Sequence, residues 1–241
     1  MKATLRPQGI SRETPDLPLE ENTASLKERE IFRADRSISY VKLPPHAPGL
    51  RVGLFGGSFN PAHQGHRAAS LLALRRLRLD CIWWLVSPGN PLKDKRELAP
   101  LPVRIEAARE IAAHPRIKIS GIETAIGTTY SFETIAYLKR RCPGVHFVWI
   151  MGADNLAGFH RWKRWRDLIN LAPIAIIDRP GSTLRSMSSR AGRILAPYRL
   201  SENAAARLAD AQPPAFVFLH GPRSALSSTA LRKTSFPTLT D

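Results

Sequence analysis

Short apolar runs alternate with longer stretches of helical periodicity from about residue 50 onward. The runs predict strands at residues 51–55, 81–86, 117–120, 146–151, 174–178 and 216–219. The intervening pattern predicts helices at residues 64–77, 101–113, 131–141, 165–170 and 228–233. Strands that are apolar throughout and alternate with helices indicate a parallel sheet covered on both faces. We therefore predict an α/β fold with a doubly wound parallel sheet, whose ligand crevice lies beyond the carboxyl ends of the strands.

The first 48 residues differ from the rest of the chain. They contain few aromatic residues, mixed charges and several prolines, a composition typical of a poorly ordered, flexible extension. A short helix is expected around residues 25–33, and acidic residues such as Glu20 and Glu21 argue against a targeting peptide. We predict an N-terminal extension at residues 1–48 and a single domain at residues 49–236. Within that domain, residues 180–197 are rich in serine and arginine and predict a loop with one short surface helix.

The net charge of the 241-residue chain is strongly positive, at +16. Such a charge favours either nucleic acid or a small polyanionic substrate as the partner. The arginines are scattered along the sequence, which favours a basic, solvated surface over a dedicated nucleic-acid arm. No apolar run is long enough to cross a bilayer, and no apolar secretory signal is visible, so we expect a cytoplasmic protein without membrane contact. The two cysteines, Cys81 and Cys142, are expected to be reduced thiols.

The most informative segment follows the first predicted strand. Residues 56–66 read GGSFNPAHQGH, which places two glycines at a strand-to-helix turn where the backbone can approach a phosphate closely. His63 and His66 share one face of the helix that follows. The glycine spacing is not that of the dinucleotide-binding fingerprint. These residues alone leave open a structural turn, a metal-binding histidine pair or a polyphosphate site, although no nearby acid or thiol completes a metal site.

Two separated motifs together resemble the nucleotidylyltransferase superfamily. Residues 56–66 are similar to its signature G-G-[ST]-F-[DN]-P-x-H-x-G-H, with Asn60 in place of the more usual Asp. Residues 226–232 read LSSTALR and are similar to its second motif, I-S-[SA]-T-x-[IL]-R. Hydroxyls and amides at a helix start, followed by an arginine one turn later, suit an anion. The resemblance implies a Rossmann-like nucleotidylyltransferase fold and catalytic roles for His63, His66 and Arg232. It implies ATP-binding residues Gly56, Gly57, Ser58, Phe59, His63, His66, Lys93, Ser227, Ser228, Thr229 and Arg232.

Segments between the two motifs resemble nicotinate-nucleotide adenylyltransferases. The segments are SPGNPLK at 87–93, GTTYS at 127–131, WIMGADNL at 149–156, FHRWKRW at 159–165 and IDRPG at 177–181. The resemblance implies that Asp154 hydrogen-bonds a ribose, that Trp162 stacks on the pyridine ring and that Arg179 contacts the mononucleotide phosphate. It implies nicotinate mononucleotide-binding residues Asn60, Tyr130, Ser131, Asp154, Trp162, Lys163 and Arg179. Simpler roles stay open, since Ser131 and Asp154 are also good helix N-caps and the aromatic and basic residues near Trp162 also suit single-stranded nucleic acid.

The resemblance implies adenylyl transfer from ATP to nicotinate mononucleotide, a step of NAD biosynthesis. The products are nicotinate adenine dinucleotide and pyrophosphate. Mg²⁺ is implied as a cofactor held mainly by the ATP phosphates, and no metal-ligating residue is predicted. ATP and nicotinate mononucleotide are the expected partners of a monomer or homodimer, without specific nucleic acid. The alternatives are a sister transferase acting on pantetheine phosphate or a polyol phosphate, a basic nucleic-acid-binding protein, and a degenerate relative without activity.

Overall fold

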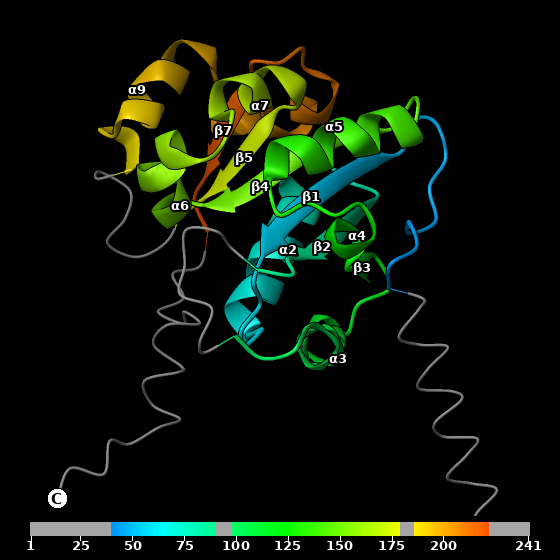
Figure 1. Ribbon diagram of the computed structural model, residues 1–241. Coiled ribbons are helices and arrows are strands. Elements are labelled where there is room, and N and C mark those ends of the chain that lie inside the picture. The colour runs from blue at the N-terminus through cyan, green and yellow to red at the C-terminus, as the bar shows by residue number, and fades with distance from the viewer. Residues whose placement is uncertain (1–39, 90–97, 179–185, 222–241) are drawn as a thin grey trace, which may run out of the picture. The chain divides into compact units, whose positions relative to one another are not determined.

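One parallel sheet organises the described part of the chain. The computed structural model describes residues 40–89, 98–178 and 186–221, all of which belong to the compact unit Ser37–Asp241. The strand order of the sheet is β3-β2-β1-β4-β5-β7-β6 (Figure 1). Its strands are β1 (Arg51–Gly57), β2 (Cys81–Val86), β3 (Ile117–Ser120), β4 (His146–Gly152), β5 (Ile174–Ile177), β6 (Arg199–Leu200) and β7 (Phe216–Leu219). Every pairing is parallel, so the predicted parallel sheet is confirmed, and only the short β6 was not predicted.

The longer helices begin where the sequence predicts and end within a residue of it. They are α2 (Gln64–Arg76), α3 (Leu101–Ala112), α5 (Ser131–Arg141) and α7 (Trp165–Leu171). The shorter elements are α4 (Ile122–Ala125), α6 (Ala153–Gly158), α9 (Arg190–Leu195) and the 3-10 turns η1 (Phe159–Arg161), η2 (Ala196–Tyr198) and η3 (Glu202–Asp210). Of these, only α9 lies in a segment for which a short helix is predicted. The helices predicted at 25–33 and 228–233 lie outside the described residues. No helix in the described ranges has the length and apolar character needed to span a membrane.

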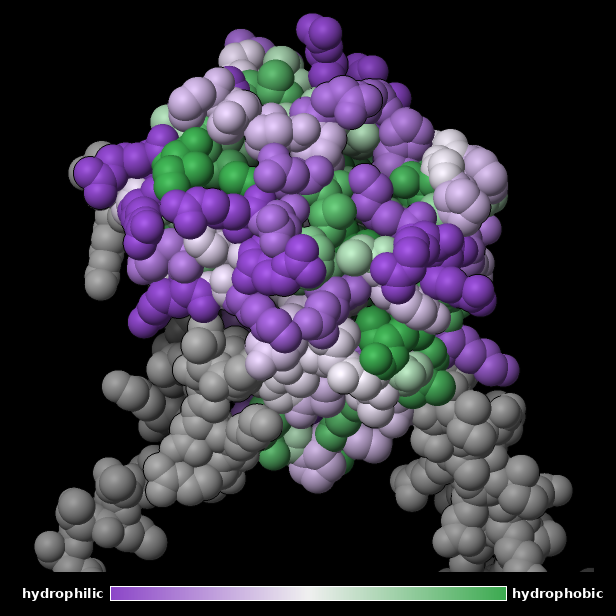
Figure 2. Space-filling model, turned by 45° about the horizontal axis from the view of Figure 1, so that its top comes forward, coloured by the Kyte–Doolittle hydropathy of each residue, from purple (hydrophilic) through white to green (hydrophobic). Residues whose placement is uncertain are grey.

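The strands send alternate side chains into two separate cores. Leu54, Trp83 and Trp149 pack with residues of α5, α6, α7 and α9, whereas Trp84 and Ile150 pack with residues of α2, α3 and η3. Figure 1 shows these two helix layers on opposite faces of the sheet. Because both faces are covered, the central strands read as continuous apolar runs, without the alternation of a half-exposed sheet. On the outside, Figure 2 shows mostly hydrophilic side chains with small, separate hydrophobic patches.

The glycines of β1 are required by the packing of the sheet. A Cβ atom at Gly53 would lie 2.6 Å from Cδ1 of Ile150, and one at Gly56 would lie 2.5 Å from Cη2 of Trp149. Ile150 and Trp149 are fully buried residues of β4, and a close-packed interior leaves them little room to move. The motif at residues 56–66 therefore has a structural function at its first glycine, in addition to any function in binding.

The strand order reverses between β1 and β4. The strands β2 and β3 follow on one side of β1, and β4 and β5 follow on the other. Loops that leave the carboxyl ends of β1 and β4 consequently run to opposite faces and leave a crevice between them. The motif at residues 56–66 begins at the end of β1 and continues through the following loop into α2, so the fold places it at the crevice. Its first two glycines, predicted at the strand-to-helix turn, are the last two residues of the strand.

A buried arginine of α3 holds the loops around this crevice together. The Arg104 guanidinium donates from Nη1 to the carbonyl oxygens of Ser58 and Ser87, each at 2.7 Å. Its Nε donates to the carbonyl oxygen of Ala99, also at 2.7 Å. The side chain is 2% exposed, and this burial lowers the pKa of the guanidinium. One side chain thus fixes the ends of β1 and β2 and the segment that leads into α3.

Arg104→Lys is expected to lower the free energy of unfolding by about 2–4 kcal/mol. A lysine ammonium cannot replace the forked geometry that reaches three carbonyl groups, and it leaves buried acceptors without donors. Urea unfolding measures the change. Arg109→Lys is the matched control on the same helix, because Arg109 pairs with the exposed Glu106; its effect should be within about 0.5 kcal/mol. Equal losses in the two variants would contradict the role of Arg104.

Candidate active site

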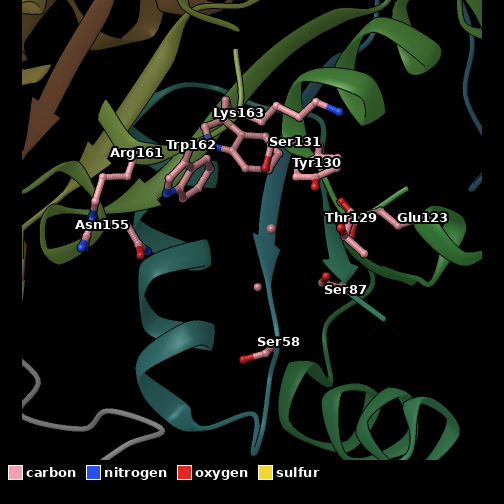
Figure 3. Close-up of a pocket in the computed structure, with 13 residues that line it drawn as sticks. Ser58, Ser87, Glu123, Thr129, Tyr130, Ser131, Asn155, Arg161, Trp162 and Lys163 are labelled. Atoms are coloured by element: carbon pink, nitrogen blue, oxygen red, sulfur yellow. The ribbon is translucent and has the colours of Figure 1, made fainter. Parts of the chain in front are cut away.

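A cavity of about 330 Å³ lies at the carboxyl edge of the sheet, beside the end of β1. This volume is within the range of sites for small molecules. Figure 3 shows its side chains converging from segments far apart in the sequence. The lining residues are Gly56, Gly57, Ser58, Ser87, Glu123, Thr129, Tyr130, Ser131, Trp149, Asn155, Arg161, Trp162 and Lys163.

The cavity brings together part of the predicted site. The predicted residues among its lining are Gly56, Gly57, Ser58, Tyr130, Ser131, Trp162 and Lys163. Four further predicted residues are not part of the lining: Phe59, Asn60 and His63 lie in the segment that joins β1 to α2, and His66 lies in the first turn of α2. Asp154 is exposed in the first turn of α6 and does not line the cavity either. The remaining predicted residues, Lys93, Arg179, Ser227, Ser228, Thr229 and Arg232, lie outside the described residues.

Phe59 belongs to the core by its side chain. It is 1% exposed, and its ring stacks on Trp84 with centroids 4.8 Å apart and an interplanar angle of 14°. Its φ of 45° is in the left-handed region, a strained conformation that the buried ring holds in place. Any contact of Phe59 with a ligand is consequently made by its backbone. The neighbouring Asn60 accepts a hydrogen bond from the Ala99 N–H at 3.2 Å through Oδ1, which fixes the turn to the segment before α3.

The two histidines cap the helix that they begin. His63 is the N-cap of α2, and its Nδ1 accepts from the Gly65 N–H at 3.1 Å. The His63 N–H donates in turn to Nδ1 of His66 at 3.2 Å. The rings lie against each other with centroids 3.8 Å apart. Because both Nδ1 atoms accept hydrogen bonds, the neutral rings carry their protons on Nε2. The caps thereby orient two Nε2–H donors at a helix N-terminus, where the backbone also favours an anion.

An aromatic wall closes one side of the cavity. The Trp162 ring meets Phe159 and Trp149 edge to face, with centroids 5.2 and 6.2 Å apart. Trp149 and Phe159 are buried, so they set the orientation of the partly exposed Trp162 ring. A rigid, partly exposed indole is well suited to stacking on a flat heterocycle.

Lys163 links this wall to the start of α5. Its Nζ lies 3.0 Å from Oε1 of Glu133 and 4.1 Å from the centroid of the Tyr130 ring. The second oxygen of Glu133 accepts from the Thr128 hydroxyl at 2.6 Å, and these bonds lower the pKa of the Glu133 carboxyl. Each partner in this pair is about half exposed, so it contributes little to stability. Its effect is geometric, because it holds Tyr130 and Lys163 beside each other at the mouth of the cavity.

A buried glutamate lies in the opposite wall. Glu123 is 4% exposed, and its Oε1 accepts from the Thr134 hydroxyl at 3.0 Å. Its Oε2 is buried and has no hydrogen-bond partner among the described residues. Burial raises the pKa of this carboxyl to about 7, although the hydrogen bond from the Thr134 hydroxyl favours the charged form. Glu123 therefore changes charge near neutral pH within the wall of the cavity.

Some lining residues were not identified as site residues from the sequence. Glu123 is one of them, and the signal that could have found it is its position just after β3, at the carboxyl edge of the sheet. Arg161 is another; its Nη2 lies where a Cβ at Gly158 would come within 2.9 Å, so that glycine leaves room for the guanidinium. Within residues 40–89, 98–178 and 186–221, no group of three or more His, Cys, Asp or Glu side chains could hold a metal ion.

Comparisons with known proteins agree on one family. A model described as cytidylyltransferase-like matches residues 54–234. The chain is 56% identical over 184 residues to a probable nicotinate-nucleotide adenylyltransferase of Brucella abortus, an alignment that covers 76% of this chain and 95% of the relative. It is 57% identical over 183 residues to a protein of the same name from Methylorubrum extorquens, with 76% and 99% covered.

Solved structures with similar folds point the same way. Plasmodium falciparum nicotinic acid mononucleotide adenylyltransferase complexed with NaAD matches with a TM-score of 0.57 at 17% identity, covering 76% of this chain and 83% of that chain. The same protein complexed with APC matches with a TM-score of 0.55 at 16% identity, with the same shares covered. At such identities the likeness concerns the fold, and it confirms the predicted Rossmann-like nucleotidylyltransferase fold.

Glu123→Gln is expected to remove a pH dependence from the stability of the protein. Folding raises the pKa of Glu123 from 4.5 to about 7, so between these values the folded chain binds more protons than the unfolded chain. The free energy of unfolding therefore falls as the pH rises through this window. At about 1.4 kcal/mol per pKa unit, the stability of the variant relative to the wild type should rise by about 2–3 kcal/mol from about pH 5 to about pH 8.

Urea unfolding of both proteins at the two pH values measures this difference. Glu110→Gln, which removes an exposed carboxyl of α3, is the control and should leave the pH dependence unchanged. A relative stability of Glu123→Gln that stays constant with pH would show that Glu123 titrates normally in the folded protein.

Proposed function

The chain belongs to the nicotinate-nucleotide adenylyltransferases of the cytidylyltransferase-like family, and from this we propose that it transfers the adenylyl group of ATP to nicotinate mononucleotide. The products are nicotinate adenine dinucleotide and pyrophosphate, in a step of NAD biosynthesis. One observation carries the proposal: the glycines at the end of β1 and the indole of Trp162 line a single cavity at the point where the strand order reverses. That cavity offers a close approach to phosphate and a stacking surface for a flat ring.

The mononucleotide is the substrate that the described cavity suits. Its pyridine ring stacks on Trp162, and its carboxylate is held by backbone amides near Ser131 and at Lys163. The ammonium of Lys163 is paired with Glu133 at 3.0 Å, so the selection of an anionic ring substituent falls to these backbone amides. By family resemblance, Asp154 binds the ribose and Arg179 and Asn60 complete the mononucleotide site.

The histidine pair serves the ATP side of the reaction. An oxygen of the mononucleotide phosphate attacks the α-phosphorus of ATP, and the bond to pyrophosphate breaks. Because the attacking oxygen is already anionic, the protein needs no general base and acts through positioning and charge stabilisation. The Nε2–H groups of His63 and His66 donate to phosphate oxygens on which charge increases. Lys93, Ser227, Ser228, Thr229 and Arg232 bind ATP phosphates by family resemblance, and Mg²⁺ is held by those phosphates and water.

The proposed function is tested by an assay of ATP-dependent pyrophosphate release with Mg²⁺. Nicotinate mononucleotide, nicotinamide mononucleotide, pantetheine phosphate and a polyol phosphate are compared as acceptors. We expect turnover with the pyridine mononucleotides alone. Turnover of pantetheine phosphate or the polyol phosphate in their place would favour a sister transferase, and the absence of all turnover would overturn the assignment.

The strong positive charge, in this proposal, attracts two anionic substrates and not a specific nucleic acid. Binding of RNA should accordingly be weak and should disappear as salt is raised. We propose a monomer or homodimer as the active species, in the cytoplasm.

His66→Ala is expected to reduce turnover by about 10²–10³-fold, the usual cost of losing one donor to a developing negative charge. The fold should lose only about 1 kcal/mol, because one capping hydrogen bond disappears with the ring. Steady-state kinetics and urea unfolding measure the two effects. His146→Ala is the control, since His146 is exposed at the opposite, amino-terminal end of β4. Near wild-type turnover of His66→Ala would remove His66 from the mechanism.

Trp162→Ala is expected to raise the KM for nicotinate mononucleotide by about 10–100-fold, in line with about 1–3 kcal/mol for a base stacked on an aromatic ring. The KM for ATP should stay unchanged, because ATP occupies the other side of the site. Trp162→Phe keeps a stacking surface and should recover most of the affinity. Equal increases of both KM values would instead indicate general distortion of the cavity.

A further inference from the structure

Glu123 is a buried ionisable group that the proposed reaction does not use. Its carboxyl lies in the cavity wall, and its Oε1 accepts a hydrogen bond from the Thr134 hydroxyl at 3.0 Å. Its Oε2 lacks a hydrogen-bond partner within the described residues. A buried, partly satisfied carboxylate is costly, and a purely structural acceptor at this position could be a neutral amide. The placement therefore calls for a reason connected with the cavity.

The backbone joins Glu123 to the wall that faces the pyridine ring. The Thr128 N–H donates to the Glu123 carbonyl oxygen at 3.0 Å, and the Tyr130 N–H donates to the Thr128 hydroxyl at 3.1 Å. Thr129, Tyr130 and Ser131 continue the lining from there, and Figure 3 shows Glu123 beside Thr129 on this wall. Glu123 consequently lines the same cavity as Tyr130 and Ser131, the segment proposed to hold the ring substituent of the mononucleotide.

The charged side chains around Glu123 have other partners, so an ionised Glu123 carboxylate is not paired with a cation among the described residues. Glu133 of α5 is paired with Lys163 at 3.0 Å, and Arg104 of α3 donates to carbonyl oxygens. Arg161 lies across the cavity in Figure 3. In a wall of low polarity, an ionised Glu123 would repel a carboxylate in the cavity and would affect a neutral amide far less.

We propose that Glu123 is a specificity-determining residue whose charge state sets the preference between the acid and the amide form of the mononucleotide. Protonated Glu123 admits nicotinate, and ionised Glu123 disfavours it relative to nicotinamide. The inference rests on the proposed function and extends it to substrate choice. The pKa of Glu123, raised by burial to about 7, places the change within an accessible pH range.

Mononucleotide binding and the protonation of Glu123 are thermodynamically linked, so the proposal can also be tested by measuring proton uptake. If ionised Glu123 disfavours a carboxylate in the cavity, a bound carboxylate must raise the pKa of Glu123 by the same free energy. Binding of nicotinate mononucleotide slightly above neutral pH should therefore take up protons from the buffer. Nicotinamide mononucleotide should take up fewer. The phosphate is common to both ligands, so its own titration cancels in the comparison.

The kinetic test compares kcat/KM for the two mononucleotides from about pH 5.5 to about pH 9. In the wild type, the ratio of acid to amide should fall by about ten-fold or more as Glu123 ionises. In Glu123→Gln the ratio should not depend on pH. In Thr134→Val the fall should move to higher pH, because the lost hydrogen bond favoured the carboxylate. Glu110→Gln, on the exposed face of α3, should behave as the wild type.

Calorimetric titration in buffers of different ionisation enthalpy measures the proton uptake, and it needs no turnover. A difference in uptake between the two ligands that disappears in Glu123→Gln supports the proposal. A ratio that is flat with pH in the wild type, or a fall that persists in Glu123→Gln, overturns it while leaving the proposed function intact. If neither mononucleotide reacts with the wild type, the proposed function fails and the inference fails with it.

Discussion

The buried guanidinium of Arg104 is the interaction on which the arrangement of this site depends. Parallel strands bring their carboxyl ends to one edge of a sheet, but they do not fix the loops that leave it. Arg104 does so by donating to the carbonyl oxygens of Ser58, Ser87 and Ala99. These groups belong to the turn after β1, the loop after β2 and the approach to α3. A single side chain thereby converts three loop ends into one rigid rim of the cavity.

The glycine motif is required both by the packing of the sheet and by the cavity. This explains why its sequence fitted a structural turn as well as a ligand-binding turn. Gly56 leaves space for the indole of Trp149 and also lines the cavity. A structural turn and a ligand-binding turn were therefore not exclusive interpretations. The same holds for His63 and His66, which cap α2 and, in the proposed function, also donate to the ATP phosphates. In this fold the binding loop and the packing of the sheet are specified by the same residues.

The sequence was sufficient for the sheet and for one wall of the site, and the reasons are physical. Strands buried on both faces are continuous apolar runs, so their positions follow from composition alone, whereas the two-residue β6 carries no such signal. The four-residue α4 is too short for periodicity, and with it Glu123 was missed. Motifs identify residues whose type is fixed by chemistry. The burial of a glutamate depends on the packing of several elements, which no local pattern records.

His63 and His66 cap the start of α2 reciprocally, so the stability of this helix start depends on both residues. Each imidazole accepts a hydrogen bond from the backbone N–H of the other histidine, so a change at one position removes a contact of the other. The two sites therefore form one thermodynamic unit, whose substitutions are not additive. The residue type at both positions is therefore selected in part by the start of α2, independently of any ligand that the imidazoles bind.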